Sequence, residues 1–317
     1  MARSGGDRGR SRTSWILLIR FIPSPIVDPL TSEVTARETA PPTISIVTSL
    51  FNQLDRTKVF LDSLEETLGE LPCEVILVDD ASTDDTPEFL EEINRSWRVL
   101  TNSKNRGFAF SNNLGAKTAQ SEVIAFLNND LILRPGWLQP MLDCLQAGEK
   151  VGCVGNVQLD ASSGKVDHAG IYFESDGSVR HARKGCRYPP SNSNFPVRAV
   201  TGACFIMYRE LFIAEGGFDE GFVNGFEDID LCLRLAEKGY QHFVSGSSCV
   251  LHHVGSARGR NPSNDSNERR FRDKWGSERL FRPEEWAKAY LSRFAGRPWR
   301  FHPTKALKAI FCLARLV

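Results

Sequence analysis

Short apolar segments alternate with helical segments along the first half of the chain, and this alternation constrains the fold more than any other feature. The predicted strands cover residues 44–48, 73–78, 97–100 and 123–127. The predicted helices between them cover residues 54–68, 87–93 and 107–119. Strands that alternate with helices at this spacing indicate βαβ crossovers, and therefore a parallel sheet with helices on both faces. We expect an α/β fold with a Rossmann-like, mostly parallel sheet.

Residues with special backbone preferences mark the ends of these segments. Gly69 follows the first predicted helix, where a C-cap glycine is expected. Thr83 or Asp84 can cap the second helix, and Pro87 is tolerated in its first turn. These signals support the predicted boundaries.

The second half of the chain is less regular. Its strand-like segments, residues 151–159, 166–173 and 199–208, are separated by loops rich in Gly, Ser, Asn and Pro. A helix is predicted at residues 227–238 and a strand at residues 241–244. We interpret this half as an extension of the sheet with long loops. Among these loops, residues 255–267 have a composition typical of a mobile segment.

Composition excludes some classes of function. The 317 residues include 39 Lys or Arg and 39 Asp or Glu, so net charge gives no support to nucleic-acid binding. The eight cysteines form no CxxC pair, and several lie in apolar runs, which is typical of reduced thiols in a reducing compartment. The apolar run at residues 15–22 is too short to span a bilayer. We expect residues 1–41 to be a disordered or weakly membrane-touching leader.

Polar residues follow several of the predicted strands. Asp79 and Asp80 follow one strand, and Asn128, Asn129 and Asp130 follow another. The carboxyl ends of parallel strands meet at one edge of a sheet, so these side chains should converge there. Carboxylates such as the first pair can accept hydrogen bonds from a ribose or a base, whereas Asp130 suits a divalent cation that bridges two phosphates. The simpler alternative is that the acidic residues only form turns and caps.

Four further acidic residues lie where the helix 227–238 begins, and they are Asp219, Glu227, Asp228 and Asp230. Acidic side chains in the first turn are favoured by the helix dipole, so capping alone could account for them. Their surroundings are rich in Phe and Gly, however, and burial there would raise a carboxylate pKa towards the range of a general base.

Five segments of the chain are considered together, and they are residues 44–48, 78–84, 105–108, 126–130 and 226–234. In this order they resemble the motifs of the inverting family 2 glycosyltransferases, which have the GT-A fold and include enzymes of bacterial surface-polysaccharide assembly and rhamnosyl transfer. The resemblance covers residues 43–280.

The resemblance implies roles for residues on the donor side. The nucleotide-sugar site would contain Thr48, Ser49, Phe51, Asn52, Asp80, Asn105, Arg106, Gly107, Asn128 and Asn129. Residues 128–130 match the DXD motif, with Asp130 as the metal-binding acid and with Asn in place of the first Asp. His252 or His253 would complete a site for Mn²⁺ or Mg²⁺, and we favour His252 because only one of two adjacent side chains can face inward.

The resemblance also implies a catalytic base and an acceptor site. Residues 227–228 match the family's ED motif, so Asp228 would deprotonate the acceptor hydroxyl, with Glu227 as the alternative. Gly202 and Ala203 would lie beneath the acceptor, although a closely packed strand explains these small residues equally well. Trp275 would belong to a closing segment on the acceptor side.

We expect three regions: the leader 1–41, a GT-A domain at 42–280 and a basic helical tail at 281–317. The GT-A domain would comprise a nucleotide-sugar half, 42–135, and an acceptor half, 136–280. In the tail, Leu307, Ile310 and Phe311 share one helical face, which could contact an anionic membrane or pack on the catalytic domain.

The predicted function is metal-dependent, inverting transfer of a hexosyl or deoxyhexosyl group from a nucleoside-diphosphate sugar to a glycan or lipid-linked acceptor. We expect a cytoplasmic protein, with a possible peripheral contact to the inner face of the membrane. The alternative is a non-catalytic carbohydrate-binding or scaffold protein that keeps the same fold.

Overall fold

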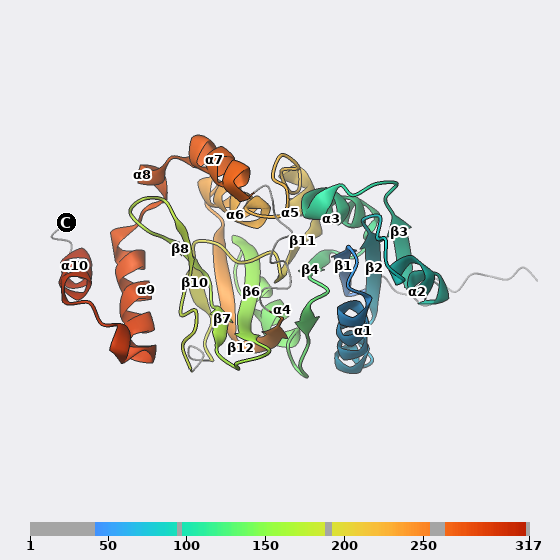
Figure 1. Cartoon of the computed structure of the whole chain (residues 1–317), viewed down its shortest axis with the longest axis horizontal. Helices are drawn as coiled ribbons and strands as arrows, with labels where there is room; N and C mark the ends of the chain where they lie inside the picture. Colours follow the sequence, from blue (N-terminus) through green and yellow to red (C-terminus); the bar gives the residue numbers. More distant parts are fainter. Residues whose placement is uncertain (1–41, 94–96, 188–191, 254–263, 315–317) are drawn as a thin grey trace, which may run out of the picture. The chain divides into compact units, whose positions relative to one another are not determined.

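The computed structural model describes residues 42–93, 97–187, 192–253 and 264–314. Most of its strands belong to one sheet: β1 (Ile44–Leu50), β2 (Cys73–Asp79), β3 (Arg98–Thr101), β4 (Val123–Leu127), β5 (Leu131–Ile132), β6 (Val151–Asp160), β7 (Val166–His168), β10 (Phe195–Val197), β11 (Cys204–Tyr208) and β12 (Gln241–His252). Eight of them follow the order β10-β12-β6-β11-β4-β1-β2-β3, while β5 pairs with β12 and β7 with β6 (Figure 1). Strands β8 (Ile171–Phe173) and β9 (Val179–His181) form a separate hairpin.

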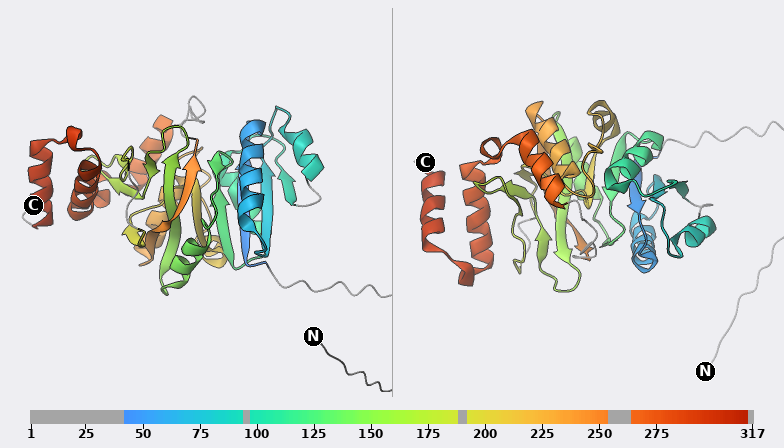
Figure 2. Two further views of the ribbon diagram at one scale, coloured as in Figure 1. Left: turned by 90° about the horizontal axis from the view of Figure 1, so that it is seen from below. Right: turned by 45° about the horizontal axis from the view of Figure 1, so that its top comes forward.

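The helices between the strands cover both faces of the sheet. They are α1 (Leu54–Leu68), α2 (Thr86–Ile93), α3 (Gly107–Thr118), α4 (Gln139–Gln146), α5 (Arg209–Ala214) and α6 (Glu227–Glu237), and α7 (Asn264–Trp275) follows the last strand. One core, beneath α1 and α4, includes Phe60 and Met141; the other, beneath α3, α5 and α6, includes Phe126 and Phe212. Figure 2 shows α1 in front of the sheet in one view, and α6 and α7 in front in the other. The predicted α/β fold is confirmed.

The parallel part of the sheet brings three strand ends together. Strand β1 pairs in parallel with both β2 and β4, and β2 pairs in parallel with β3. Strand β11 is antiparallel to β4 and β6, so it joins the two parallel halves of a mixed sheet. Every residue of β4 is buried because both of its faces are covered. The polar residues after β1, β2 and β4 consequently share one edge.

The irregular half differs in detail from the prediction. The strand predicted at 166–173 is two strands, β7 and β8, because the backbone turns at Gly170, whose φ is +93°. The strand predicted at 199–208 begins only at Cys204. The strand predicted at 241–244 continues to His252, since a bulge between Ser245 and Cys249 lets β12 keep pairing with β6.

After α7 the described chain continues through α8 (Ser277–Leu280), α9 (Pro283–Gly296), the 3₁₀ turn η1 (Pro298–Arg300) and α10 (Pro303–Leu313). In the described ranges, no helix combines the length and apolar character that a membrane crossing requires. The predicted leader, most of the loop predicted at 255–267 and the last three residues of the tail lie outside the described residues.

Candidate active site

A cavity of about 450 Å³ lies where the ends of β1, β2 and β4 meet the segment before α6. It is lined by many of the predicted site residues: Ser49, Phe51, Asp80, Asn105, Gly107, Asn128, Asn129, Asp130, Gly202, Ala203, Glu227 and Asp228. The strand-end residues and the acidic helix start, which are about 100 to 180 residues apart in sequence, therefore face the same space.

Asp80 joins the end of β2 to the start of α3. Its Oδ1 accepts hydrogen bonds from the Asn102 side chain and the Arg106 backbone N–H, each at 2.7 Å, and its Oδ2 accepts the Gly107 N–H at 2.7 Å. These backbone groups begin α3, where the helix dipole favours a negative charge. The carboxylate is thus held rigidly at the cavity wall.

Three predicted donor-side residues lie behind this wall. Thr48 is fully buried in β1. The Asn52 side-chain oxygen accepts the Thr83 N–H at 2.7 Å and so connects two loops. The Arg106 guanidinium stacks over Phe110, 3.8 Å from the ring centroid. These contacts position the cavity lining, whereas Ser49, Phe51 and Asn105 are part of it.

Strand pairing brings Asp130 and His252 together. The His253 N–H donates to the Asp130 carbonyl oxygen at 2.9 Å, and His252 Nε2 lies 3.4 Å from Asp130 Oδ1. The other imidazole nitrogen, Nδ1, lies 3.0 Å from Asp167 Oδ2, and this carboxylate also pairs with Lys184. Burial alone would lower the pKa of His252, but hydrogen bonds and charge from Asp130 and Asp167 raise it to about 9.

This arrangement fits a divalent cation. A carboxylate oxygen and an imidazole nitrogen are both common ligands of Mn²⁺. A metal-binding histidine usually donates its second N–H to a carboxylate, and Asp167 is placed to accept it. Sequence reasoning missed Asp167, because an acid inside a short strand carries no motif. The Asn129 amide, by contrast, donates to Thr57 of α1 at 2.9 Å and fastens the DXD-like turn to that helix.

The two acids at the start of α6 have different environments. Asp228 Oδ2 accepts the Gly202 N–H at 2.5 Å, and its Oδ1 accepts the Ile229 N–H at 2.8 Å. Glu227 is 5% exposed, and its Oε2 accepts the Gly225 N–H at 2.6 Å. Burial raises the pKa of both acids, and the neighbouring Asp228 carboxylate helps raise that of Glu227 to about 8. Two N–H bonds favour the charged form of Asp228, so the shared proton belongs on Glu227.

The backbone around these acids explains two of the small or strained residues. A Cβ at Gly202 would lie 3.2 Å from the Phe108 ring and 3.3 Å from Asp228 Cβ, so only glycine fits without movement. Phe226 immediately precedes α6 with a φ of 77°, a left-handed conformation that is costly for a bulky residue. The strain directs the following two carboxylates, and such strain is common at functional sites.

A histidine pair forms another part of the cavity region that sequence reasoning did not find. His181 lines the cavity, and its Nδ1 lies 3.2 Å from Nδ1 of the buried His168. The Gly170 N–H donates to His168 Nε2, so the His168 proton is on Nδ1 and faces His181. His181 then carries its own proton on Nε2. Burial lowers the pKa of both histidines, to about 4 for His181, and keeps the pair neutral.

Trp275 does not line the cavity. It is buried, and its indole N–H donates to Asp230 Oδ1 at 2.9 Å. The same carboxylate pairs with Lys274 at 2.7 Å and, through Oδ2, with Arg234 at 2.8 Å. Trp275 therefore holds α7 against α6, behind the acidic helix start, and does not contact the predicted acceptor site directly.

Comparison with solved structures identifies this architecture as the GT-A fold. The structure described as "GalNAc-T7 with UDP, GalNAc and Mn2+" has a TM-score of 0.61 and 17% identity, and the match covers 81% of this chain and 51% of that one. A mannosyltransferase from Pyrobaculum calidifontis, in complex with GDP-Man and Mn²⁺, has a TM-score of 0.55 and 19% identity, covering 88% of this chain and 82% of that one. At these identities the likeness concerns the fold.

The family follows from the sequence. A family model described as "Glycosyl transferase family 2" matches residues 45–215, and the chain belongs to this family. It is 31% identical over 227 residues to the O-antigen biosynthesis protein RfbC of Myxococcus xanthus. This match covers 68% of this chain and 18% of that protein. The chain is 27% identical over 245 residues to a Mycobacterium tuberculosis N-acetylglucosaminyl-diphospho-decaprenol L-rhamnosyltransferase. This match covers 70% of this chain and 78% of that protein. The matched region spans 26% and 18% of the lengths of two of the curated relatives, the second of which is RfbC.

Proposed function

We propose that the protein is a metal-dependent, inverting glycosyltransferase. It would move a hexosyl or deoxyhexosyl group from a nucleoside-diphosphate sugar to a hydroxyl of a glycan or lipid-linked acceptor. The observation that carries this proposal is that Asp130, 3.4 Å from His252, lines the same cavity as Asp228. A site for the leaving diphosphate and a base for the acceptor are the two groups that this reaction requires.

The nucleoside half of the donor is assigned to the ends of β1 and β2 and the start of α3. Ser49, Phe51, Asp80 and Asn105 supply an aromatic ring, hydrogen-bond acceptors and a carboxylate to the cavity wall. Two proteins of the same fold were solved with UDP or GDP-Man together with Mn²⁺, which supports a nucleotide-sugar donor here.

Asp130 and His252 would hold the divalent cation, Mn²⁺ or Mg²⁺. Asp167 would orient the imidazole, and Asn128 would offer a carbonyl oxygen without a negative charge. When bound, such a cation offsets the charge that develops on the leaving nucleoside diphosphate. The protein's own residues then provide the remaining chemistry at the acceptor.

Asp228 would act as the base. Its carboxylate accepts N–H bonds from Gly202 and Ile229, which favour the charged form, while burial keeps Glu227 protonated. The carboxylate would take the proton of the acceptor hydroxyl while the oxygen attacks the anomeric carbon from the face opposite the diphosphate. A single displacement of this kind inverts the anomeric configuration.

Gly202 and Ala203 would form the floor beneath the acceptor. The named substrate of the mycobacterial relative is a lipid-linked sugar, which supports an acceptor of that class. All eight cysteines are free thiols, which supports a location in the reducing cytoplasm. The proposed catalytic domain covers residues 42–280, and residues 281–317 form an additional helical region.

A thermal-shift screen of nucleoside diphosphates and their sugars, with and without Mn²⁺, tests the proposal. A ligand that binds only the folded state raises the melting temperature, so at least one nucleotide should do so in a Mn²⁺-dependent manner. The variant Asp130→Ala should lose the Mn²⁺-dependent part of the shift, measured relative to its own unliganded melting temperature. Binding without any release of nucleoside diphosphate would instead favour the non-catalytic alternative.

A further inference from the structure

Helix α10 packs on α9 through small side chains and exposes large ones. Its buried residues are Ala306, Ala309 and Cys312, and the last two join a small core that contains Trp286 and Ala287 of α9. Its large apolar side chains are exposed: Leu307 by 55%, Ile310 by 57% and Phe311 by 40%. An amphipathic helix of a globular domain normally buries its large apolar face. Here that face is exposed, on a helix that lies at the outer edge of the described structure beside α9 (Figure 1).

Exposed apolar side chains concentrate in this region. Nine large apolar residues are exposed in the described part of the chain, and six of them lie within residues 299–313: Trp299, Phe301, Leu307, Ile310, Phe311 and Leu313. Trp299, in the turn before α10, is 76% exposed. Scattered apolar residues on a surface need no explanation, but a concentrated group marks an interaction site. We call Trp299, Leu307, Ile310 and Phe311 the α10 surface.

The chain segment that carries the α10 surface has charge of one sign. Residues 288–317 contain seven Lys or Arg and no Asp or Glu. Lys288, Lys305 and Lys308 are exposed, and the Lys308 ammonium lies over the Phe281 and Trp286 rings at 5.6 and 5.3 Å from their centroids. A second copy of the chain would oppose like charges across this surface, which disfavours self-association. We propose that the α10 surface binds an anionic lipid bilayer, with its apolar side chains at the acyl boundary and its lysines among the headgroups.

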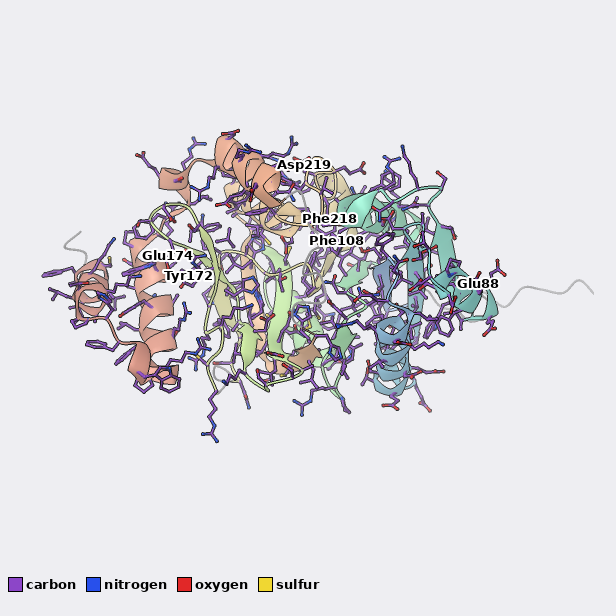
Figure 3. The ribbon with its side chains drawn as sticks, viewed as in Figure 1. Glu88, Phe108, Tyr172, Glu174, Phe218 and Asp219 are labelled. Carbon is purple, nitrogen blue, oxygen red and sulfur yellow. The ribbon has the colours of Figure 1, made fainter. Side chains whose placement is uncertain are left out.

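The α10 surface is connected to the cavity by a single strand. In β8, Ile171 lines the cavity, while the next residue, Tyr172, is buried in the small core shared with α9 and α10. Glu174, just after β8, accepts a hydrogen bond from the Trp286 indole at 2.8 Å. Figure 3 shows Tyr172 and Glu174 beside α9. Bilayer binding through α10 would therefore hold the β8 side of the cavity near the membrane, where the head of a lipid-linked acceptor is found. This consequence rests on the proposed function, whereas the bilayer binding does not.

Vesicle sedimentation of the full chain tests the proposal. The protein should sediment with vesicles of phosphatidylcholine and phosphatidylglycerol, and much less with phosphatidylcholine alone, and 1 M salt should weaken the binding. The double variant Leu307→Asp/Ile310→Asp should lower the partition coefficient at least about tenfold, because it removes two apolar side chains and adds negative charge. The matched control is Val59→Asp/Ile213→Asp, which alters residues of α1 and α5 with similar exposures of 44% and 41% and should bind as the unmodified protein does.

Two outcomes would overturn the proposal. One is equal sedimentation of the α10 variant and the control, with both melting temperatures unchanged. The other is dimer formation in light scattering that depends on Leu307 and Ile310 and occurs without vesicle binding, which would identify a second copy as the occupant. Nucleotide thermal shifts measured on the same variants report separately on the donor site, so failure of lipid binding cannot be mistaken for failure of the proposed activity.

Discussion

Replacing Asp228 with Asn removes the carboxylate that is proposed to take the acceptor proton, while it keeps the size of the side chain. The Gly202 N–H, which donates to Asp228 Oδ2 at 2.5 Å, can donate to the amide oxygen of Asn in the same way, and only the bond from the Ile229 N–H is lost. The fold and the nucleotide affinity should therefore change little. Loss of a general base typically lowers the rate 10²- to 10⁴-fold, which corresponds to about 3–5 kcal/mol in the activation free energy.

The matched control is Glu227→Gln. Burial and the Asp228 charge raise the pKa of Glu227 to about 8, so at pH 7 the acid is mostly protonated, and Gln resembles that neutral form. We expect its rate to stay within about threefold of the unmodified protein, since no charge is lost at that pH. The assay is the release of nucleoside diphosphate at pH 7 with Mn²⁺, using the donor found by thermal shift. A slow Glu227→Gln variant together with an active Asp228→Asn variant would refute the assignment and make Glu227 the base.

Three further predictions concern the residues around the site. Asp167→Asn should lower Mn²⁺-dependent nucleotide affinity about 10- to 100-fold, because His252 loses its orienting carboxylate; unchanged affinity in calorimetric titration would contradict this. Glu227 binds a proton in the folded state that the unfolded chain releases between pH 4.5 and about 8, so the free energy of unfolding should fall as pH rises through that window. Urea denaturation at pH 5 and pH 9 should show that the free energy of unfolding falls less for Glu227→Gln than for the unmodified protein. An equal fall in both proteins would exclude the buried acid as its source. Trp275→Phe should lower the free energy of unfolding by about 1–3 kcal/mol by leaving Asp230 short of a donor, with nucleotide affinity unchanged; lost affinity at unchanged stability would place Trp275 at the ligand.

The regular half of the fold could be predicted from the sequence because its signals are local. A buried strand, a polar turn and a helix follow one another within about 30 residues, and each βαβ unit has only one favoured arrangement. The convergence of Asp80 and Asp130 followed from parallel strand order alone. Asp84 caps the start of α2 as anticipated, since its Oδ1 accepts the Thr86 N–H at 3.1 Å.

The rest of the site depends on contacts between distant segments that leave no local pattern. Asp167 reaches His252 across 85 residues, and His181 meets His168 because the β8–β9 hairpin brings the chain back beside Gly170. Trp275 follows a basic, aromatic segment that suggests a ligand contact, yet its indole N–H is used by a buried acid. In each case tertiary packing decides which partner a polar side chain finds.

The bulge in β12 decides which of two adjacent histidines reaches Asp130. Ser245 is opposite Asn156, but the next paired residue, Cys249, is opposite Val157, so three residues of β12 are skipped. Three is an odd number, and the alternation of side chains therefore reverses: Val244 faces the core beneath α3 and α6, whereas Val250 faces the core beneath α1 and α4. His252 is two residues after Val250, so its side chain points to the same face, the one beneath α1 and α4. A bulge of two or four residues would have directed His253 to that face instead. The proposed metal site thus depends on a residue count several positions upstream of the histidine itself.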